Sequence, residues 1–234
     1  MATRYFHEFG TTRQQLAQIA LNGRRNAMLS ADAVYRTPMS LDDYLAARMV
    51  STPLCLFDCD VPIDGAVAMV VSHVDTMKDM RTPSIRIEAI CGPLHGRNTW
   101  DQQADLTRFS GADAAKQLWS RTDLRPKDVD VVQLYDGFSF LALLWLEDMG
   151  FCGRGEAAEF IEDGKRIALD GELPLNTSGG QLSFGRLHGM GLILEACVQL
   201  RQIGGQRQVP NGPRVALVTN GGGPVASAVL LIRE

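Results

Sequence analysis

The sequence predicts an α/β fold in which helices cover a mixed β-sheet. Two kinds of sequence pattern alternate along most of the chain. One is short runs, β-branched or alternating in polarity, that are typical of strands, and the other is amphipathic runs that are typical of helices. Only the three glycines at 221–223 separate the last two strand-like runs, which indicates an antiparallel hairpin. Alternation followed by a hairpin predicts a sheet with both parallel and antiparallel strands.

Two helices and one strand are expected at the start of the chain. Apolar residues recur at helical spacing from Leu16 to Ala27, behind threonines that can cap the helix. Ser40 followed three residues later by Asp43 is a capping-box pattern and predicts the start of a second helix. The apolar, β-branched run Ala66–Val71 predicts a buried strand.

The polar stretch 75–84 is the best candidate for a boundary between two units. The unit before it is too small to form a domain, because one strand and two helices cannot bury both faces of a sheet. The sequence therefore predicts that further structure is missing on the N-terminal side of this unit.

The second unit is expected to alternate strands and helices up to the hairpin. The run 138–149 is apolar on all sides, so it should be a helix buried within the fold. The run 190–203 has one apolar face and ends at glycines that can cap a helix. The predicted elements are strands at Ile85–Cys91, Val129–Leu134, 214–220 and 224–233, and helices at 111–120, 138–149 and 190–203.

Composition and charge exclude several classes of protein. The 234 residues are 45% hydrophobic and 21% charged, as in soluble globular proteins. A net charge of −4 with basic and acidic residues interleaved offers no electrostatic case for binding nucleic acid. No apolar stretch is long enough for a membrane span, and the first residues lack the apolar core of a signal peptide. A cytoplasmic protein is expected.

The five cysteines are scattered and odd in number. Cys55 and Cys59 form a C-x-x-x-C pair, but no second pair of Cys or His at ligand spacing completes a zinc site. We therefore expect reduced, mostly buried thiols and no bound metal.

Tyr135, Asp136 and Gly137 lie in the turn between a predicted strand and the buried helix. One interpretation is structural, with Asp136 accepting backbone N–H groups as a helix cap. The other is catalytic, with Tyr135 donating or accepting a proton at a bound substrate. A phenol with an ordinary pKa near 10 needs a neighbouring positive charge or hydrogen-bond donor to act as a base near neutral pH.

A glycine-rich loop precedes the last predicted helix, and a second glycine-rich stretch forms the predicted hairpin turn. The loop could simply permit close packing, but its density of glycines indicates positive φ angles or a close approach to a ligand. The hairpin glycines are more typical of a turn than of a phosphate site, because no Gly-Lys-Ser/Thr follows them. Candidate residues are Asn176, Ser178, Gly180, Arg186 and His188 in the loop, and Thr219, Asn220, Gly221 and Gly222 in the hairpin.

Four sequence segments together resemble the thiolase superfamily, in its sterol-carrier-protein-x thiolase and lipid-transfer-protein branch. They are "FGTTRQQLAQIA", "VVQLYDGFSF", "NTSGGQLSFGRLHGMG" and "VALVTNGGGP", in the order that the family has them. The resemblance covers nearly the whole chain. It implies a thiolase-like fold, with residues 1–81 as the residual C-terminal part of the N-terminal domain and residues 82–234 as the C-terminal domain.

The sequence departs from thiolases at the positions that carry their chemistry. The segment with the nucleophilic cysteine has no counterpart here. The Asn/His-Glu-Ala-Phe motif aligns with Tyr135–Phe138, the histidine of Gly-His-Pro aligns with Arg186, and the cysteine of Cys-x-Gly aligns with Thr219. A Claisen reaction needs a thiolate and a second base, so ordinary thiolase activity is not expected.

These changes resemble those of the thiolase-like aldolases that break down steroid side chains. The resemblance implies retro-aldol cleavage of a β-hydroxyacyl-CoA, with acyl-CoA as substrate and no cofactor. Tyr135 would act as base or acid beside Asp136, and His188 as its partner or as proton donor to the enolate. Arg186 or loop N–H groups would stabilise the thioester oxygen. The remaining substrate-binding candidates are Asn176, Ser178, Gly180, Thr219, Asn220, Gly221 and Gly222.

Two rival functions stay open. The chain could be a non-catalytic or incomplete subunit of a split thiolase-like complex, since a lone C-terminal half would expose an apolar face. It could also be an acetyl-CoA acyltransferase that uses a cysteine from a partner. The resemblance implies a homodimer, or a complex with an N-terminal thiolase half, with a zinc-ribbon/OB-fold acyl-CoA-binding protein, or with both. Neither nucleic acid nor a membrane is an expected partner.

Overall fold

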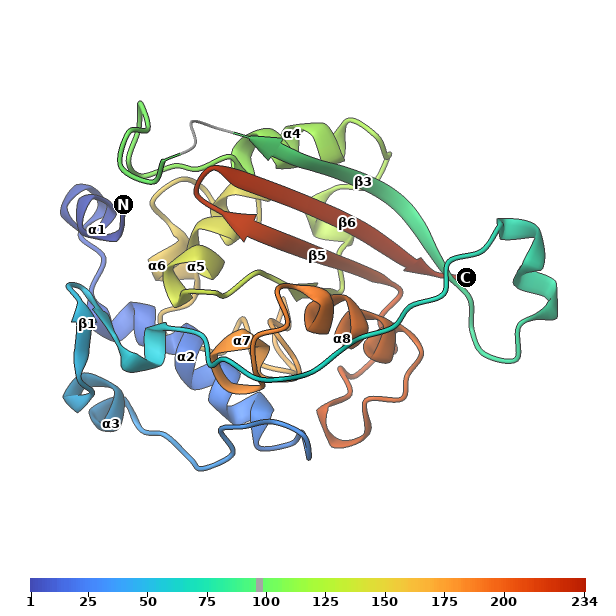
Figure 1. The fold of residues 1–234 in the computed structure, drawn as a ribbon, viewed down its shortest axis with the longest axis horizontal. Helices are drawn as coiled ribbons and strands as arrows, with labels where there is room; N and C mark the ends of the chain where they lie inside the picture. The colour runs from blue at the N-terminus through green and yellow to red at the C-terminus, as the bar shows by residue number, and fades with distance from the viewer. Residues whose placement is uncertain (96–98) are drawn as a thin grey trace.

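The computed structural model describes residues 1–95 and 99–234 and centres on a four-stranded mixed sheet (Figure 1). Strand order is β3-β6-β5-β4, in which β4 and β5 are parallel and the other neighbours are antiparallel. The predicted mixed sheet and its C-terminal hairpin are therefore confirmed. The strands are β3 (Ile85–His95), β4 (Val131–Gln133), β5 (Val215–Gly222) and β6 (Val225–Arg233).

Helices cover this sheet. Helix α4 (Gly111–Trp119) packs against β3 and β6, and α8 (Met190–Leu200) packs against β4 and β5. Helix α5 (Ser139–Asp148) is buried from its first residue through Leu146, as its uniform apolarity predicts. The prediction for the end of α8 was wrong. The helix stops at Leu200, Gln202 takes the left-handed φ of 60°, and Ile203 is 65% exposed.

The N-terminal part consists of helices and a small two-stranded sheet, and two of its helices, α1 and α2, contact α5. Thr12 and Ser40 each form the reciprocal capping box with the residue three positions later, which explains where α2 and α3 begin. Helix α2 packs against both α5 and α7 (Gly180–Ser183). The elements are α1 (Ala2–Phe9), α2 (Arg13–Ala27), α3 (Leu41–Ala46), β1 (Met49–Ser51), β2 (Leu54–Cys55) and η1 (Leu56–Asp58).

Short helical turns complete the chain. They are η2 (Val74–Asp79), η3 (Pro126–Asp128), α6 (Ala157–Phe160), α7 (Gly180–Ser183) and η4 (Gly205–Arg207).

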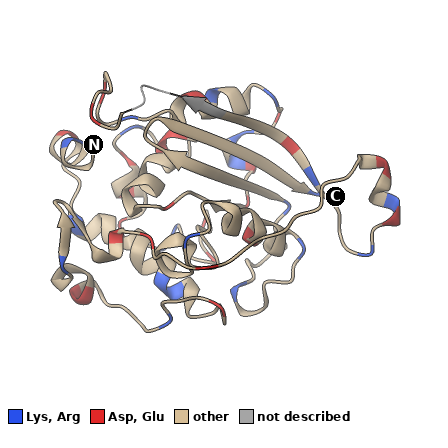
Figure 2. Cartoon of the chain, viewed as in Figure 1, with Lys and Arg blue, Asp and Glu red and all other residues tan. Residues whose placement is uncertain are grey.

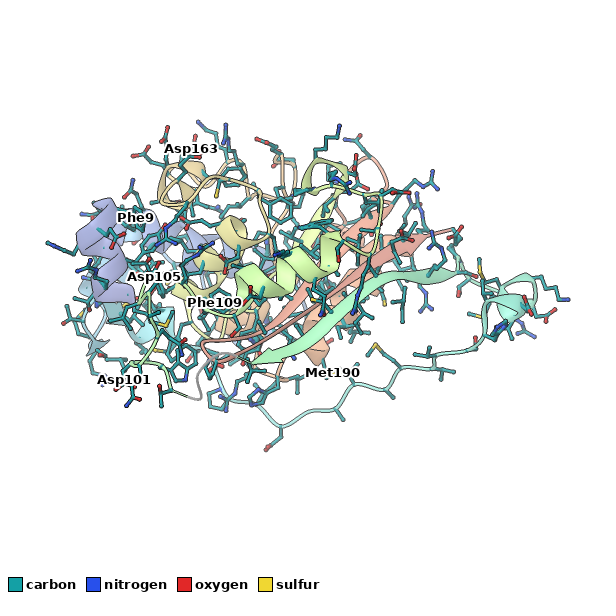
Figure 3. The ribbon with its side chains drawn as sticks, turned by 90° about the horizontal axis from the view of Figure 1, so that it is seen from above. Phe9, Asp101, Asp105, Phe109, Asp163 and Met190 are labelled. Carbon is teal, nitrogen blue, oxygen red and sulfur yellow. The ribbon has the colours of Figure 1, made fainter. Side chains whose placement is uncertain are left out.

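Helix α1 is joined to the second half of the chain by Arg154. The guanidinium of Arg154 forms an ion pair with Asp105 at 2.6 Å and lies 5.7 Å from the ring centre of Phe9, which belongs to α1. Figure 3 shows Phe9 and Asp105 on the same side of the molecule. The hydroxyl of Tyr5 also donates to Glu147 in α5. Together these contacts dock a terminal helix onto the buried one.

The buried strand predicted at Ala66–Val71 is wrong. These residues form no strand, and the side chains of Val70 and Val71 are 97% and 77% exposed. The chain then enters η2, the teal excursion at the right of Figure 1. A strand needs a neighbour for its backbone hydrogen bonds, and none of the described residues supplies one at this place.

Charges of both signs are spread over the chain rather than gathered on one face (Figure 2). Within residues 1–95 and 99–234, no helix is long and apolar enough to cross a membrane. The same residues contain no group of three metal-binding side chains.

Asp58 joins three elements and should be important for stability. Its carboxylate accepts from the hydroxyl of Tyr44 at 2.7 Å, from Ser139 at 2.5 Å, and from the backbone N–H of Cys55 at 2.7 Å. The side chain is fully buried, so no water can replace it.

We predict that Asp58→Ala lowers the free energy of unfolding by about 3 kcal/mol, because three buried donors lose their acceptor. Urea denaturation measures this change. Asp58→Asn, which keeps one acceptor oxygen, should lose less. Asp64→Ala changes an exposed carboxylate and is the control; equal losses in Asp58→Ala and Asp64→Ala would contradict the assignment.

Candidate active site

The three predicted stretches come together at the end of β4. The turn 135–137 follows β4, the loop 176–189 lies beside it, and the end of β5 lies on its other side. Asn176 makes the first connection. Its side chain accepts from the backbone N–H of Leu134 at 2.8 Å and donates to the same residue's carbonyl at 2.9 Å. It therefore binds the backbone as a neighbouring strand would, and this places the loop.

Asp136 makes the second connection. Its carboxylate is 1% exposed and accepts from the backbone N–H groups of Gln181 at 2.9 Å and Leu182 at 3.4 Å. It therefore caps α7, whereas the sequence placed its capping role at the following helix, α5. That helix begins after Phe138 without a side-chain cap.

The burial of Asp136 raises its pKa to about 7, against hydrogen bonds from Gln181, Leu182 and Asn176 that lower it. Gly180 permits the contact. Its φ is 61°, and a Cβ there would lie 2.0 Å from the carboxylate. The positive φ predicted for the glycine-rich loop is therefore found at Gly180. The group that approaches this glycine closely is a protein side chain.

Tyr135 and His188 face one another. The phenol oxygen lies 3.5 Å from Nδ1 of the imidazole, within long hydrogen-bond distance. Tyr135 is 9% exposed, whereas His188 is exposed and has the left-handed φ of 47°. Gly137 leaves room for the ring, since a Cβ there would lie 2.7 Å from it.

Burial raises the pKa of Tyr135, and the negative charge of Asp60 raises it further. The polar side chain of Gln181 and the charge of Arg186 oppose this effect. The phenol is therefore protonated near neutral pH. The phenol can therefore relay a proton, by donating its own as it accepts one from a substrate, but it does not act as an ionised tyrosinate base.

Asp60 is a member of this group that no sequence motif indicated. Its Oδ2 lies 3.5 Å from Nε of Arg186, and its side chain is 16% exposed. Burial raises the pKa of Asp60, while the charges of Arg186 and His188 lower it. The sequence held no local signal for this residue, because its partners come from segments far along the chain.

The remaining predicted residues mainly shape the backbone. Thr219 is fully buried, and its hydroxyl accepts from the backbone N–H of Tyr135 at 2.9 Å. Gly221 accepts from the indole of Trp145 at 3.1 Å. A Cβ on Gly222 would lie 2.8 Å from Leu141. Gly221 and Gly222 thus form the end of β5, packed on α5, directly before the hairpin turn.

Two predicted residues lie at the margins of the group. Ser178 is buried, and its carbonyl accepts from Ser30 at 3.0 Å. Asn220 is exposed and lies over Gly189, where a Cβ would meet it at 2.7 Å. Phe138 follows the 135–137 turn and Met190 follows the 176–189 loop, and both are partly exposed, at 40% and 36%. The group therefore lies at an open surface with both polar and apolar parts.

Comparison with known proteins identifies the family. The model of the thiolase C-terminal domain-like family matches residues 92–234. A 17-hydroxy-3-oxo-4-pregnene-20-carboxyl-CoA lyase of Mycobacterium tuberculosis is 36% identical over 99% of this chain and 60% of its own length. A steroid side-chain-cleaving aldolase of Thermomonospora curvata is 35% identical over 98% of this chain and 59% of its own.

The fold matches as well. A solved structure described as an Ltp2-ChsH2(DUF35) aldolase superposes with a TM-score of 0.93 at 34% identity, over 99% of this chain and 61% of that one. The expected thiolase-like α/β fold is confirmed. This chain spans about 60% of the length of the relatives it matches.

The raised pKa of Asp136 makes stability depend on pH. A carboxyl that ionises near 3.8 when unfolded and near 7 when folded stabilises the fold below pH 4, and this contribution is lost as pH rises to about 7. Asp148, whose pKa burial also raises to about 7, acts in the same direction.

We predict that Asp136→Asn makes the fall in unfolding free energy between pH 4 and 7 shallower by about 1 kcal/mol per pH unit. Urea denaturation at several pH values measures the slope, with Asp64→Asn as the exposed control. Identical slopes in Asp136→Asn and the unmodified chain would show that Asp136 keeps an ordinary pKa.

Proposed function

Because this chain belongs to the thiolase C-terminal domain-like family, we propose that it acts on acyl-CoA thioesters by retro-aldol cleavage of a β-hydroxyacyl-CoA. The observation that carries the proposal is the pair formed by Tyr135 and His188, 3.5 Å apart. Cleavage of a carbon–carbon bond next to a hydroxyl group begins with removal of the hydroxyl proton, and a phenol–imidazole pair can accept it.

The state of the cysteines argues against a thiolase reaction. All five thiols are free, and burial raises the pKa of each one. A thiolase nucleophile needs the opposite, a thiol that ionises readily. Thr219, at the position of the second thiolase cysteine, is occupied with the backbone N–H of Tyr135. An acyltransferase reaction would therefore need its nucleophile from elsewhere.

The proposed reaction conserves its protons. The phenol of Tyr135 takes the proton of the β-hydroxyl as its own proton passes to Nδ1 of His188. The bond between the α and β carbons breaks, the β carbon becomes a ketone, and the electron pair forms a thioester enolate. The guanidinium of Arg186 stabilises the negative oxygen. The proton then returns through Tyr135 to the α carbon, which yields a shorter acyl-CoA.

The relatives support a steroid substrate. Both that are named above act, by their descriptions, on steroid side chains or on a pregnene carboxyl-CoA, and they align with nearly the whole of this chain. We extend this class to the present chain, in which the exposed apolar residues Phe138 and Met190, each close in sequence to a member of the pair, suit contact with a large apolar acyl group.

We further propose that the chain works in a complex. The exposed apolar run 66–71 has the composition of a strand and no neighbour among the described residues, which suits pairing with the sheet of an N-terminal thiolase half. A protein with a DUF35 domain is the second proposed partner, because the solved aldolase above is described together with one. The resemblance likewise implies a second partner, expected there as a zinc-ribbon/OB-fold acyl-CoA-binding protein.

A non-catalytic subunit is the second candidate function, and the open surface around Tyr135 and His188 favours it. In that case the chain would support assembly while another polypeptide carried out the chemistry. Variants of the two residues separate the candidates, because a non-catalytic subunit tolerates their loss.

We predict that Tyr135→Phe and His188→Ala each reduce ketone release from a steroidal β-hydroxyacyl-CoA by about 100-fold, the usual contribution of a general acid–base group. The assay uses the chain co-expressed with its proposed partners. His7→Ala, on helix α1, is the matched control. Full activity in both site variants would refute the catalytic assignment and leave the non-catalytic subunit.

We predict that backbone amides of 66–71 exchange rapidly in the isolated chain and slowly in the complex, because pairing with a sheet protects them. Val70→Lys should weaken association by tenfold or more. Ile203→Lys, which changes an apolar residue that is 65% exposed at another site, should not. Rapid exchange in the complex together with normal assembly of Val70→Lys would contradict the pairing.

A further inference from the structure

Asp60 lies in a short segment, 59–62, that runs between the 135–137 turn and the 176–189 loop of the site. Its backbone N–H donates to the carbonyl of Gly137 at 3.3 Å. The next residue, Val61, donates to the carbonyl of Gln181 at 3.1 Å and accepts from the N–H of Arg186 at 2.8 Å. The 59–62 segment therefore binds the 135–137 turn on one side and the 176–189 loop on the other.

The residue that precedes the 59–62 segment is also fixed in place. Asp58, fully buried, ties the segment to Tyr44 and to Ser139 at the start of α5. The side chain of Asp60 is thus carried on a backbone fixed at both ends, and a fixed backbone places a charge accurately.

We propose that Asp60 is a positioning residue of the site: its carboxylate holds the guanidinium of Arg186 beside Tyr135 and His188 and balances its charge. The catalytic meaning of this inference rests on the proposed function, whereas the placement rests on the contacts alone. Arg186 carries a permanent positive charge. Without a carboxylate beside it, a proton arriving on His188 would meet an uncompensated like charge.

The same arrangement acts on Tyr135. Asp60 raises the pKa of the phenol and Arg186 lowers it, so the two charges oppose each other at one hydroxyl group. Removing either one should move the ionisation of Tyr135, and in opposite directions. The charged or titratable groups around this phenol are Asp60 from the 59–62 segment, Asp136 from its own turn, and Arg186 and His188 from the loop.

The test measures the ionisation of residue 135 directly. The tyrosine at 135 is replaced by 3-fluorotyrosine, whose more acidic phenol ionises at lower pH than that of tyrosine, and fluorine NMR follows its ionisation against pH. We expect Asp60→Asn to lower the midpoint by about one pH unit and Arg186→Gln to raise it by a similar amount. The double variant should return close to the starting value. Asp60→Glu, which keeps the charge, should move the midpoint least.

The outcomes are distinct. Opposite shifts that cancel in the double variant support the charge pair, whether or not the complex cleaves a β-hydroxyacyl-CoA. Unchanged midpoints, or shifts in the same direction, overturn it. Arg186→Gln tests the pair from its other member, so the inference stays open to refutation if Asp60→Asn fails to fold. A loss of ketone release in Tyr135→Phe alone concerns the proposed function and not this pair.

Discussion

The close approach of the 176–189 loop to the end of β4 is the contact on which the candidate site depends. Buried backbone groups must be paired, and here two side chains pair them. Asn176 binds both backbone groups of Leu134, and Asp136 binds the N–H groups that begin α7. Gly180 leaves room for that carboxylate. These contacts hold the turn that carries Tyr135 against the loop that carries His188.

The proposed site adds a pattern of charge to this frame. Tyr135 stays protonated because it is buried near acidic groups, which suits a residue that passes protons on. Asp60, the only one of these groups outside the second half of the chain, brings a carboxylate to Arg186. The 59–62 segment thus connects the N-terminal part to the site, since the carboxylate of Asp60 reaches the loop from there.

Features set by neighbours in sequence could be predicted, and features set by distant contacts could not. The starts of α2 and α3 follow from capping residues three positions apart, and α5 follows from its apolar composition. The prediction of a strand at 66–71 was wrong because β-branched composition shows only a tendency to form a strand. The neighbouring strand that it would need is not among the described residues. Tyr135 and His188 were predicted as candidates from their turn and their glycine-rich loop, and the resemblance supplied the roles expected of them. Asp60 was missed because its partners lie far along the chain.

We propose that the site cleaves a carbon–carbon bond without a thiol nucleophile. The consumption of free CoA during turnover by the assembled complex tests it most directly. Retro-aldol cleavage of a steroidal β-hydroxyacyl-CoA should release one ketone and one shorter acyl-CoA while the concentration of free CoA stays constant. Thiolysis consumes one CoA for each bond broken. A loss of free thiol equal to the product formed, with acetoacetyl-CoA as an accepted substrate, would contradict the account.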